Sequence, residues 1–198
     1  MRHLMRFTIK PALSGTLCCL LTLTSPTAMA ETIENIEYKY YQISPRTPHE
    51  IKPELMRKTP IREFGGSFNG RTDWYIDWSF NSRSTQYGCQ LTSTVTKVRV
   101  VYILPALSEH VKDAKTIEVF NQFNTALTQH EHNHGEHGLK AAREIDDAFK
   151  QIPPQRNCRN LARYVDAIAN IIVDKYVRLD DEYDRSTRNG ETEGAVIY

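Results

Sequence analysis

The segment from Cys89 to Leu104, CQLTSTVTKVRVVYIL, is rich in valine and threonine, and this composition decides the fold class. β-Branched side chains favour extended backbone, and the residues fall into two alternating sets that begin at Leu91 and Thr92. Such alternation is typical of a strand whose two faces meet different surroundings. We therefore predict a long strand that starts at Cys89 and ends at Pro105, because proline cannot donate a hydrogen bond to a neighbouring strand.

The chain changes character after Asp113, where apolar residues recur at spacings of three and four. This period predicts an amphipathic helix, which Pro153 and Pro154 end. A second amphipathic helix is predicted from about Asn157, and a polar tail follows it. The apolar positions are Ile117, Phe120, Leu127, Leu139, Ala142, Ile145 and Phe149 in the first helix, and Leu161, Val165, Ile168, Ile172, Tyr176, Leu179 and Tyr183 in the second.

Two further strands are predicted upstream of Cys89, at residues 33–43 and 72–80, where aromatic and β-branched residues alternate in part with polar ones. Between them, Thr47 and Pro48 indicate the start of a short helix that continues to about Met56, with Glu50 placed to reach back to the cap. A glycine-rich loop then precedes the second strand. Because strands come first and helices second, we predict an α+β domain with a small, largely antiparallel sheet followed by two long helices.

Residues 1–30 have the pattern of a secretory signal peptide. Basic residues precede an apolar run from Leu17 to Leu23, and small residues follow, so cleavage is expected after Ala30. A single-span membrane anchor is the alternative, but a spanning helix needs roughly 20 apolar residues and this run is far shorter. We therefore expect a periplasmic or secreted protein with one mature domain, residues 31–198, and no stable membrane span after cleavage.

Cleavage would remove Cys18 and Cys19 and leave two cysteines, Cys89 and Cys158. In an oxidising compartment two thiols in one small domain most simply form a disulfide, with two free buried thiols as the alternative. Cleavage also removes three of the 25 basic residues and none of the 24 acidic ones, which leaves 22 basic residues and a formal charge of −2. We therefore expect no nucleic-acid partner.

The residues that point to chemistry are His130, Glu131 and His134, which form an HExxH motif within the first predicted helix. Residues four apart on a helix lie about 40° apart around the axis and about 6 Å apart along it, so both imidazoles can bind one metal ion. Glu131 lies about 100° from His130 and can reach a metal-bound water without binding the metal itself. Zinc accepts such ligands, with three protein ligands and a water in catalytic sites. A solvated polar helix face is the alternative.

A third histidine, His137, lies on the same helix face but about 10 Å from His130 along an unbroken helix, too far for one ion. A break at Gly135 or Gly138 would bring it closer. The extended motif HExxHxxGxxH is absent because Lys140 occupies the position of its third histidine, which excludes a metzincin. His132 points away from this face and is expected to be exposed.

The mature chain as a whole resembles the bacterial domain-of-unknown-function family described as predicted secreted zinc-dependent proteases. The resemblance implies a zincin-like fold and peptidase activity, with His130 and His134 as zinc ligands and Glu131 as the general base. It rests on the signal peptide, the aromatic strand with Thr72, Trp74 and Trp78, Cys89 before a Val/Thr-rich strand, Leu104-Pro105, the HExxH helix, Cys158, and a terminal Tyr-Asp-x-x-Thr segment.

The terminal motif of that family reads Tyr-Asp-x-x-Thr-x-His-Gly, and this chain departs from it at Asn189, which stands in place of the histidine. Zinc seldom accepts a neutral amide, whereas carboxylate oxygen binds it well, so we predict Asp184 as the third ligand. A salt bridge at the helix end is the alternative role for Asp184. The other candidate ligands are Glu144, His137 and His110.

These patterns predict a zinc metallopeptidase that hydrolyses a peptide or protein substrate with Glu131 as general base. Tyr183 is a candidate donor to the oxyanion, and the aromatic strand around Trp74 is a candidate wall of the substrate cleft. The simpler interpretation is a core or surface tyrosine in the first case and core packing in the second. The alternative is a non-catalytic envelope protein with a degenerate zincin fold that binds metal or a partner. The imidazole-rich segment HEHNHGEH could hold zinc, nickel or copper without using Glu131.

Overall fold

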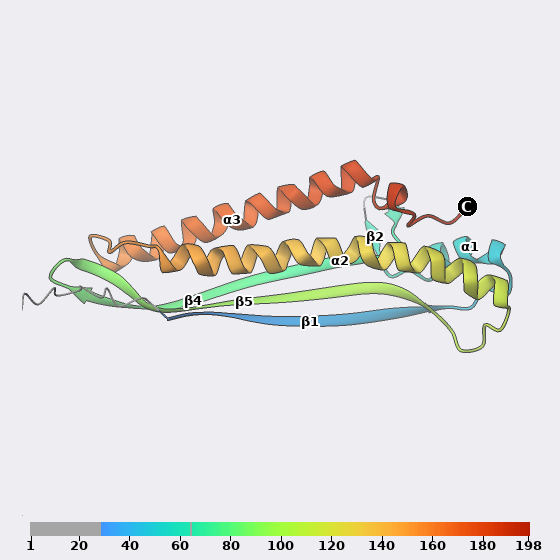
Figure 1. Ribbon diagram of the computed structural model, residues 1–198, viewed down its shortest axis with the longest axis horizontal. Helices are drawn as coiled ribbons and strands as arrows, with labels where there is room; N and C mark the ends of the chain where they lie inside the picture. Colours follow the sequence, from blue (N-terminus) through green and yellow to red (C-terminus); the bar gives the residue numbers. More distant parts are fainter. Residues whose placement is uncertain (1–28, 64) are drawn as a thin grey trace, which may run out of the picture.

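The computed structural model describes residues 29–63 and 65–198 and shows an α+β fold (Figure 1). Its main sheet has the strand order β1-β5-β4, where β1 is Met29–Ile43, β4 is Arg71–Thr85 and β5 is Gly88–Leu107. β4 pairs with β5 in antiparallel fashion, but β1 pairs with β5 in parallel. The sheet is therefore mixed rather than largely antiparallel. The predicted α+β class is confirmed, and only the direction of β1 differs, because the alternation within a strand does not show the direction in which a distant strand joins it.

The predicted signal peptide lies almost wholly outside the described residues, which begin at Met29. Cys18, Cys19 and the apolar run belong to that part of the chain. Ala30, the predicted cleavage position, is the second residue of β1. Among the described residues, no helix combines the length and the apolar character needed to cross a membrane.

Two long helices follow the sheet strands, as predicted. α2 (Ala114–Lys150) lies along one face of the sheet, and α3 (Cys158–Thr187) packs on α2 (Figure 1). Each begins at a polar cap, since the Asp113 side chain accepts the N–H of Thr116 and the Asn157 side chain accepts the N–H of Asn160. The smaller elements are η1 (Pro48–Glu50), α1 (Ile51–Lys58), β2 (Arg62–Glu63), β3 (Gly66–Ser67) and η2 (Glu191–Glu193).

Two local predictions were wrong. Thr47 makes no side-chain cap, and Glu50 accepts the N–H of Arg46 instead. β5 also continues through Pro105 to Leu107. The pairing with β4 ends where Arg71 faces Ile103, so among the described residues only β1 borders β5 at Pro105. Proline is tolerated there because one side of the strand has no partner that would need its missing N–H.

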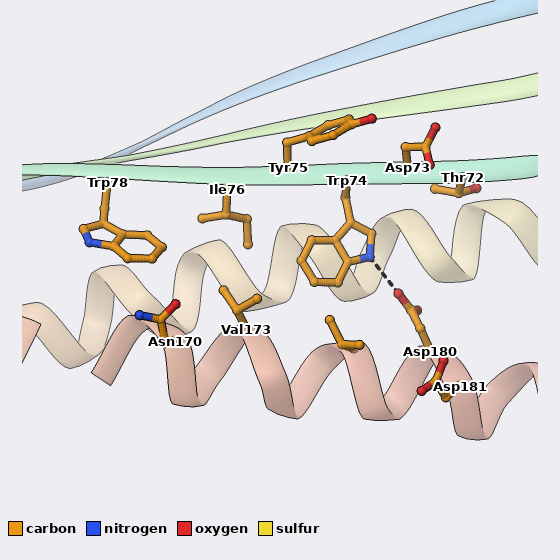
Figure 2. A pocket seen from close by; sticks show the side chains of 11 residues that line it. Thr72, Asp73, Trp74, Tyr75, Ile76, Trp78, Asn170, Val173, Asp180 and Asp181 are labelled. Atoms are coloured by element: carbon orange, nitrogen blue, oxygen red, sulfur yellow. Dashed lines mark hydrogen bonds between the residues drawn. The ribbon is translucent and has the colours of Figure 1, made fainter. Parts of the chain in front are cut away.

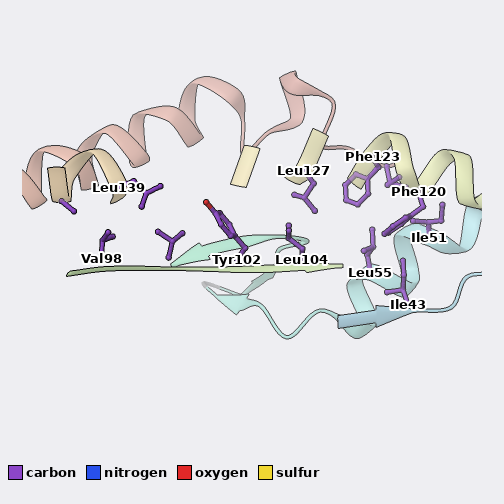
Figure 3. Close-up of a cluster of buried hydrophobic side chains, with 13 residues drawn as sticks. Ile43, Ile51, Leu55, Val98, Tyr102, Leu104, Phe120, Phe123, Leu127 and Leu139 are labelled. Carbon is purple, nitrogen blue, oxygen red and sulfur yellow. The ribbon is translucent and has the colours of Figure 1, made fainter. Parts of the chain in front are cut away.

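The core has two parts. The first lies between α1, β5 and α2 (Figure 3), and the second lies between the second half of α2, α3 and the start of β5. Trp74 and Ile76 of β4 pack against both. The largest fully buried side chains of the first part are Ile43, Ile51, Leu55 and Leu104, and those of the second are Ile145, Phe149, Leu161 and Val165.

Two glycines let α2 lie close to the sheet. A Cβ on Gly135 would stand 1.9 Å from the Tyr102 hydroxyl of β5, and a Cβ on Gly138 would stand 2.6 Å from the Trp74 ring of β4. The helix passes through both residues unbroken, so neither ends it, although a helix break at one of them was the route by which His137 could approach His130. Their spacing of three residues places both on the face that meets β4 and β5.

The predicted disulfide is confirmed: Cys89, near the start of β5, is bonded to Cys158, the first residue of α3. Two backbone hydrogen bonds between Cys89 and Gln155, of 2.7 and 2.8 Å, hold the same two segments together. The disulfide therefore ties the beginning of α3 to the sheet.

The Cys89→Ser/Cys158→Ser double variant is expected to unfold at lower denaturant concentration than the wild type. The two cysteines are 69 residues apart, and closing a loop of that length in the unfolded chain corresponds to about 4 kcal/mol of stability. Equilibrium unfolding in urea, followed by circular dichroism, measures the difference. A double variant as stable as the oxidised wild type would contradict this expectation.

Candidate metal centre

His130, His134 and Asp184 bring three potential ligand atoms together between the two long helices. One turn of α2 separates His130 from His134, and Asp184 lies near the end of α3. The Nε2 atoms of the two histidines are 3.3 Å apart, and Asp184 Oδ1 lies 3.2 Å from His130 Nε2 and 3.0 Å from His134 Nε2. The structure thus unites all three residues that the sequence indicated as ligands.

These separations match the donor spacing of a tetrahedral zinc site. Zinc binds imidazole nitrogen and carboxylate oxygen at about 2.0–2.1 Å, so two donors of a tetrahedral site lie about 3.3 Å apart. The three observed separations are 3.0–3.3 Å. Two imidazoles and one carboxylate are also a donor set that catalytic zinc sites use, with the fourth position left for water. The residues present therefore fit zinc in number, type and spacing.

Each of the two histidines has a carboxylate on its other ring nitrogen. His130 Nδ1 lies 2.8 Å from Glu193 Oε2, and His134 Nδ1 lies 2.9 Å from Asp180 Oδ1. A carboxylate that accepts the Nδ1 proton leaves the Nε2 lone pair free for a metal and fixes the orientation of the ring. Asp180 and Glu193 therefore set the tautomer that a metal site at His130 and His134 requires.

Asp180 joins several of the surrounding side chains. Its Oδ2 accepts the indole N–H of Trp74 at 2.7 Å, and its Oδ1 lies 2.6 Å from His137 Nδ1 as well as close to His134. His134, His137 and Asp180 form a second group that could hold an ion. That group uses the Nδ1 side of His134, opposite to the Nε2 atom that meets Asp184. His137 is thus a neighbour of Asp180 and does not complete the first group.

The charges of the metal-free site are strongly coupled. Burial disfavours the charged form of His134, but hydrogen bonds with Asp180 and Asp184 outweigh it and raise the pKa of the imidazole to about 10. The pKa of His130 is also raised, because its hydrogen bonds with Asp184 and Glu193 overcome burial. Burial likewise disfavours the Asp184 carboxylate, yet the two histidines hold its pKa well below the usual range. Asp184 therefore favours the charged form of both imidazoles, and they favour its charged form.

Glu131 lines the same cavity. Among the described residues, its carboxylate is hydrogen-bonded to Thr72 and not to His130, His134 or Asp184. The residue is only 5% exposed, and its Oε2 accepts a 2.7 Å hydrogen bond from the Thr72 hydroxyl of β4. Burial raises the pKa of the carboxyl, while the hydrogen bond from Thr72 and the nearby histidines oppose the rise. Gly70 allows the approach, since a Cβ there would lie 2.6 Å from Glu131 Oε1.

A cavity of about 730 Å³ opens over these groups. Glu131 and the three candidate ligands line it, and Asn189 lies at its border. Asn189 is exposed and donates its backbone N–H to the Asp184 carbonyl at 2.8 Å, in the turn that follows α3. The three ligand atoms come together without the Asn189 side chain, so this arrangement does not need the histidine found at that position in the resembled motif.

The other histidines and acids named from the sequence lie elsewhere. Glu144 is bound to Lys175 and Tyr176, and His110 follows β5 in an exposed turn. His132 is partly buried rather than exposed, because its Nε2 meets the Tyr38 hydroxyl at 3.0 Å on the far side of α2. Of the four histidines in the HEHNHGEH segment, only His130 and His134 meet the Asp184 carboxylate.

Tyr183 contacts His130 and Glu193 but does not line the cavity. Its ring stacks on His130 with centroids 4.9 Å apart, and its hydroxyl donates to Glu193 at 2.7 Å. The Asn133 side-chain amide donates to the same hydroxyl at 2.6 Å. Because the hydroxyl is committed to Glu193, the sequence-based role of Tyr183 as an oxyanion donor has no support from these contacts.

Sequence reasoning missed Asp180 and Glu193. A signal for Asp180 was present: Asp180 and Asp184 are four residues apart on α3, just as His130 and His134 are on α2. Two such pairs on packed helices can face each other. Glu193 lies in η2 beyond the helix, and no periodicity connects it to His130.

Replacing the supporting carboxylates is expected to weaken metal binding without removing a ligand. Asp180→Asn and Glu193→Gln should each lower zinc affinity by about 10–100-fold, because the Nδ1 atoms lose their charged partners. Competition with a zinc chelator measures the change. Glu191→Gln, the same substitution at an exposed residue of η2, is the matched control and should bind zinc as the wild type does. Equal affinities in all four proteins would contradict this role.

Zinc affinity is expected to increase with pH. The ring of His134 holds a proton at neutral pH because its pKa is raised to about 10, and the pKa of His130 is raised as well. Zinc must displace such protons, so affinity should rise about tenfold per pH unit for each proton released between pH 6 and 8. Calorimetry in buffers of different ionisation enthalpy counts the protons. An affinity independent of pH would show that the rings are neutral before binding.

The raised pKa of His134 has the opposite effect on the stability of the metal-free fold, which decreases as pH rises. The interactions of His134 stabilise that fold fully below the unfolded-state pKa of about 6.5, and this contribution is lost as pH rises through the folded-state value of about 10. Metal affinity and the stability of the metal-free fold are therefore expected to change in opposite directions as pH rises above about 6.5.

The family model "Bacterial protein of unknown function (DUF922)" matches residues 38–191, which include the HExxH motif, Cys89, Cys158 and Asp184. No curated protein and no solved structure matches the chain. The matched segment covers most of the 198 residues, so the chain belongs to the DUF922 family of bacterial proteins of unknown function.

Proposed function

We propose that this protein is an exported zinc-dependent peptidase. The observation that carries the proposal is the triangle of His130, His134 and Asp184 donor atoms, 3.0–3.3 Å apart, in the same cavity as the Glu131 carboxylate. A metal-storage site would need only the triangle. A buried carboxylate held by Thr72 beside that triangle is what a hydrolase needs in addition.

His130, His134 and Asp184 would hold zinc, and zinc bound there would polarise a substrate carbonyl and lower the pKa of a water molecule. Glu131 is the group in the cavity that can accept a proton from the attacking water and return it to the leaving amine. Its raised pKa suits this exchange, because a base with a pKa nearer to neutrality both takes and gives a proton readily. The hydroxyl of Thr72 keeps the carboxylate oriented.

Export is supported by the predicted signal peptide and by the Cys89–Cys158 disulfide, since such bonds persist in oxidising compartments. The substrate is proposed to be a peptide or protein because HExxH sites activate water against amide carbonyls. Peptidoglycan amide bonds call for the same water activation, so they belong in the substrate panel.

The test uses the purified mature chain, residues 31–198, with its disulfide formed. We expect one zinc ion per chain by elemental analysis and cleavage of a peptide library analysed by mass spectrometry. Removal of zinc by a chelator should abolish cleavage, and added zinc should restore it. One tightly bound zinc without cleavage of peptides or peptidoglycan fragments would favour a non-catalytic metal-binding protein, and the absence of tight zinc binding would overturn the proposal.

A further inference from the structure

A second cavity of about 530 Å³ lies between β4 and α3 and continues into the candidate metal centre. The two cavities share lining residues from both elements, Thr72 and Asp73 of β4 and Asp180 and Asp181 of α3. We call the second cavity the β4–α3 groove. Figure 2 shows Trp74, Ile76 and Trp78 extending from β4 toward α3, with Asn170 and Val173 opposite them and Tyr75 on the other side of the strand.

The floor of the groove is apolar and follows the period of the strand. Trp74, Ile76 and Trp78 are two residues apart, so they share one face of β4, and Val173 and Val177 of α3 form the other wall. Val177 is 44% exposed although it lies beside the Trp and Ile side chains. At about 3.3 Å per residue, Trp74 to Trp78 span about 13 Å, the length of roughly four residues of extended peptide.

The groove is aligned with the candidate centre. On the same face of β4, two residues before Trp74, the Thr72 hydroxyl binds the Glu131 carboxylate. The Trp74 indole donates to Asp180, which also meets His134. A chain lying along β4 with its reacting carbonyl at Glu131 would therefore place its next side chains over Trp74, Ile76 and Trp78.

The geometry points to a specificity subsite: the β4–α3 groove selects extended peptides with large apolar side chains, aliphatic or aromatic, on one side of the cleaved bond. The inference rests on the proposed peptidase function and names its substrate class. Acidic side chains are disfavoured, because Asp180 and Asp181 border the groove where it meets the metal cavity. Burial of one large apolar side chain in the groove corresponds to a gain of about tenfold to a hundredfold in affinity.

The experiment measures peptide binding in the groove under conditions in which no peptide is cleaved. The chain has two tryptophans, Trp74 and Trp78, and both line the groove, so intrinsic fluorescence reports an occupant directly. Zinc-loaded Glu131→Gln protein is titrated with a peptide that carries Leu and Phe at alternate positions and with a second peptide that carries Glu at those positions. We expect a saturable fluorescence change with the Leu/Phe peptide at concentrations at least tenfold lower than with the Glu peptide.

Val177→Asp adds a charge at the rim of the groove, and Ile171→Asp makes a similar change at a residue of α3 that is 67% exposed and does not line it. Val177→Asp should weaken binding of the Leu/Phe peptide by about tenfold or more and raise KM for its cleavage, with zinc content unchanged, whereas Ile171→Asp should match the parent protein.

The outcomes separate the two proposals. If the wild type binds the Leu/Phe peptide preferentially but cleaves no peptide, the groove is a peptide-binding site and the proposed peptidase function is overturned. Cleavage that shows no apolar preference, with no effect of Val177→Asp and no fluorescence response, would retain the peptidase and overturn the subsite.

Discussion

Glu131→Gln is expected to retain one zinc ion per chain while its peptide cleavage falls by a factor of about 10²–10⁴, the usual contribution of a general base. Glutamine keeps the shape of the side chain and can still accept a hydrogen bond from Thr72, but it cannot take a proton from water. Because Glu131 lies outside the triangle of ligand atoms, zinc content should not change. The loss should appear mainly in kcat, since the carboxylate acts on water rather than on the substrate.

The matched control is Glu136→Gln, which makes the same chemical change at an exposed position of α2. It should cleave peptides at the wild-type rate. Cleavage that survives in the Glu131 variant would show that Glu131 is not the base, and loss of zinc from that variant would show that the residue supports the metal instead. Elemental analysis and single-turnover kinetics on the two variants distinguish these results.

His134→Ala and Asp184→Ala are expected to lose tight zinc binding. The binding free energy of four-ligand structural zinc sites is about 10–16 kcal/mol, which corresponds to roughly 3 kcal/mol per ligand, or about a hundredfold in affinity for each ligand removed. The loss at His134 should be the greater, because this ring contacts both Asp180 and Asp184. Chelator competition measures the affinity, and cleavage should disappear in both variants.

His132→Ala is the control, because its imidazole lies two residues from His134 but meets Tyr38 and Tyr102 rather than the candidate ligands. It should bind zinc as tightly as the wild type. If instead His132→Ala released zinc and Asp184→Ala retained it, the ligand set proposed from the geometry would be wrong. Circular dichroism of each variant separates loss of metal from loss of fold.

The features that could be predicted from the sequence are those with a short-range pattern. Period-two and period-3.6 alternation located β4, β5, α2 and α3, and the four-residue spacing placed His130 and His134 on one face. The disulfide followed from counting the cysteines that remain after signal cleavage. Asp184 is different, since only its position in the resembled terminal motif selected it among many acidic residues.

The features that were missed depend on contacts between distant segments. The parallel pairing of β1 with β5, the carboxylates of Asp180 and Glu193 behind the histidines, and the close approach of Gly138 to Trp74 all join residues more than 40 positions apart. A single sequence without relatives shows which residue types are available for such contacts. It does not show which of them the packing of two helices will bring together.

The disulfide and the candidate metal centre lie near opposite ends of α3, at Cys158 and Asp184. About 39 Å of helix, at 1.5 Å per residue, separates them. A helix fixed to the sheet at its first residue holds Asp184 at a high effective concentration beside His130 and His134, so the covalent bond would contribute a chelate effect to metal binding at a candidate centre that it does not contact. Zinc should therefore bind less tightly to the reduced chain, and oxidation of the thiols would precede tight metal binding.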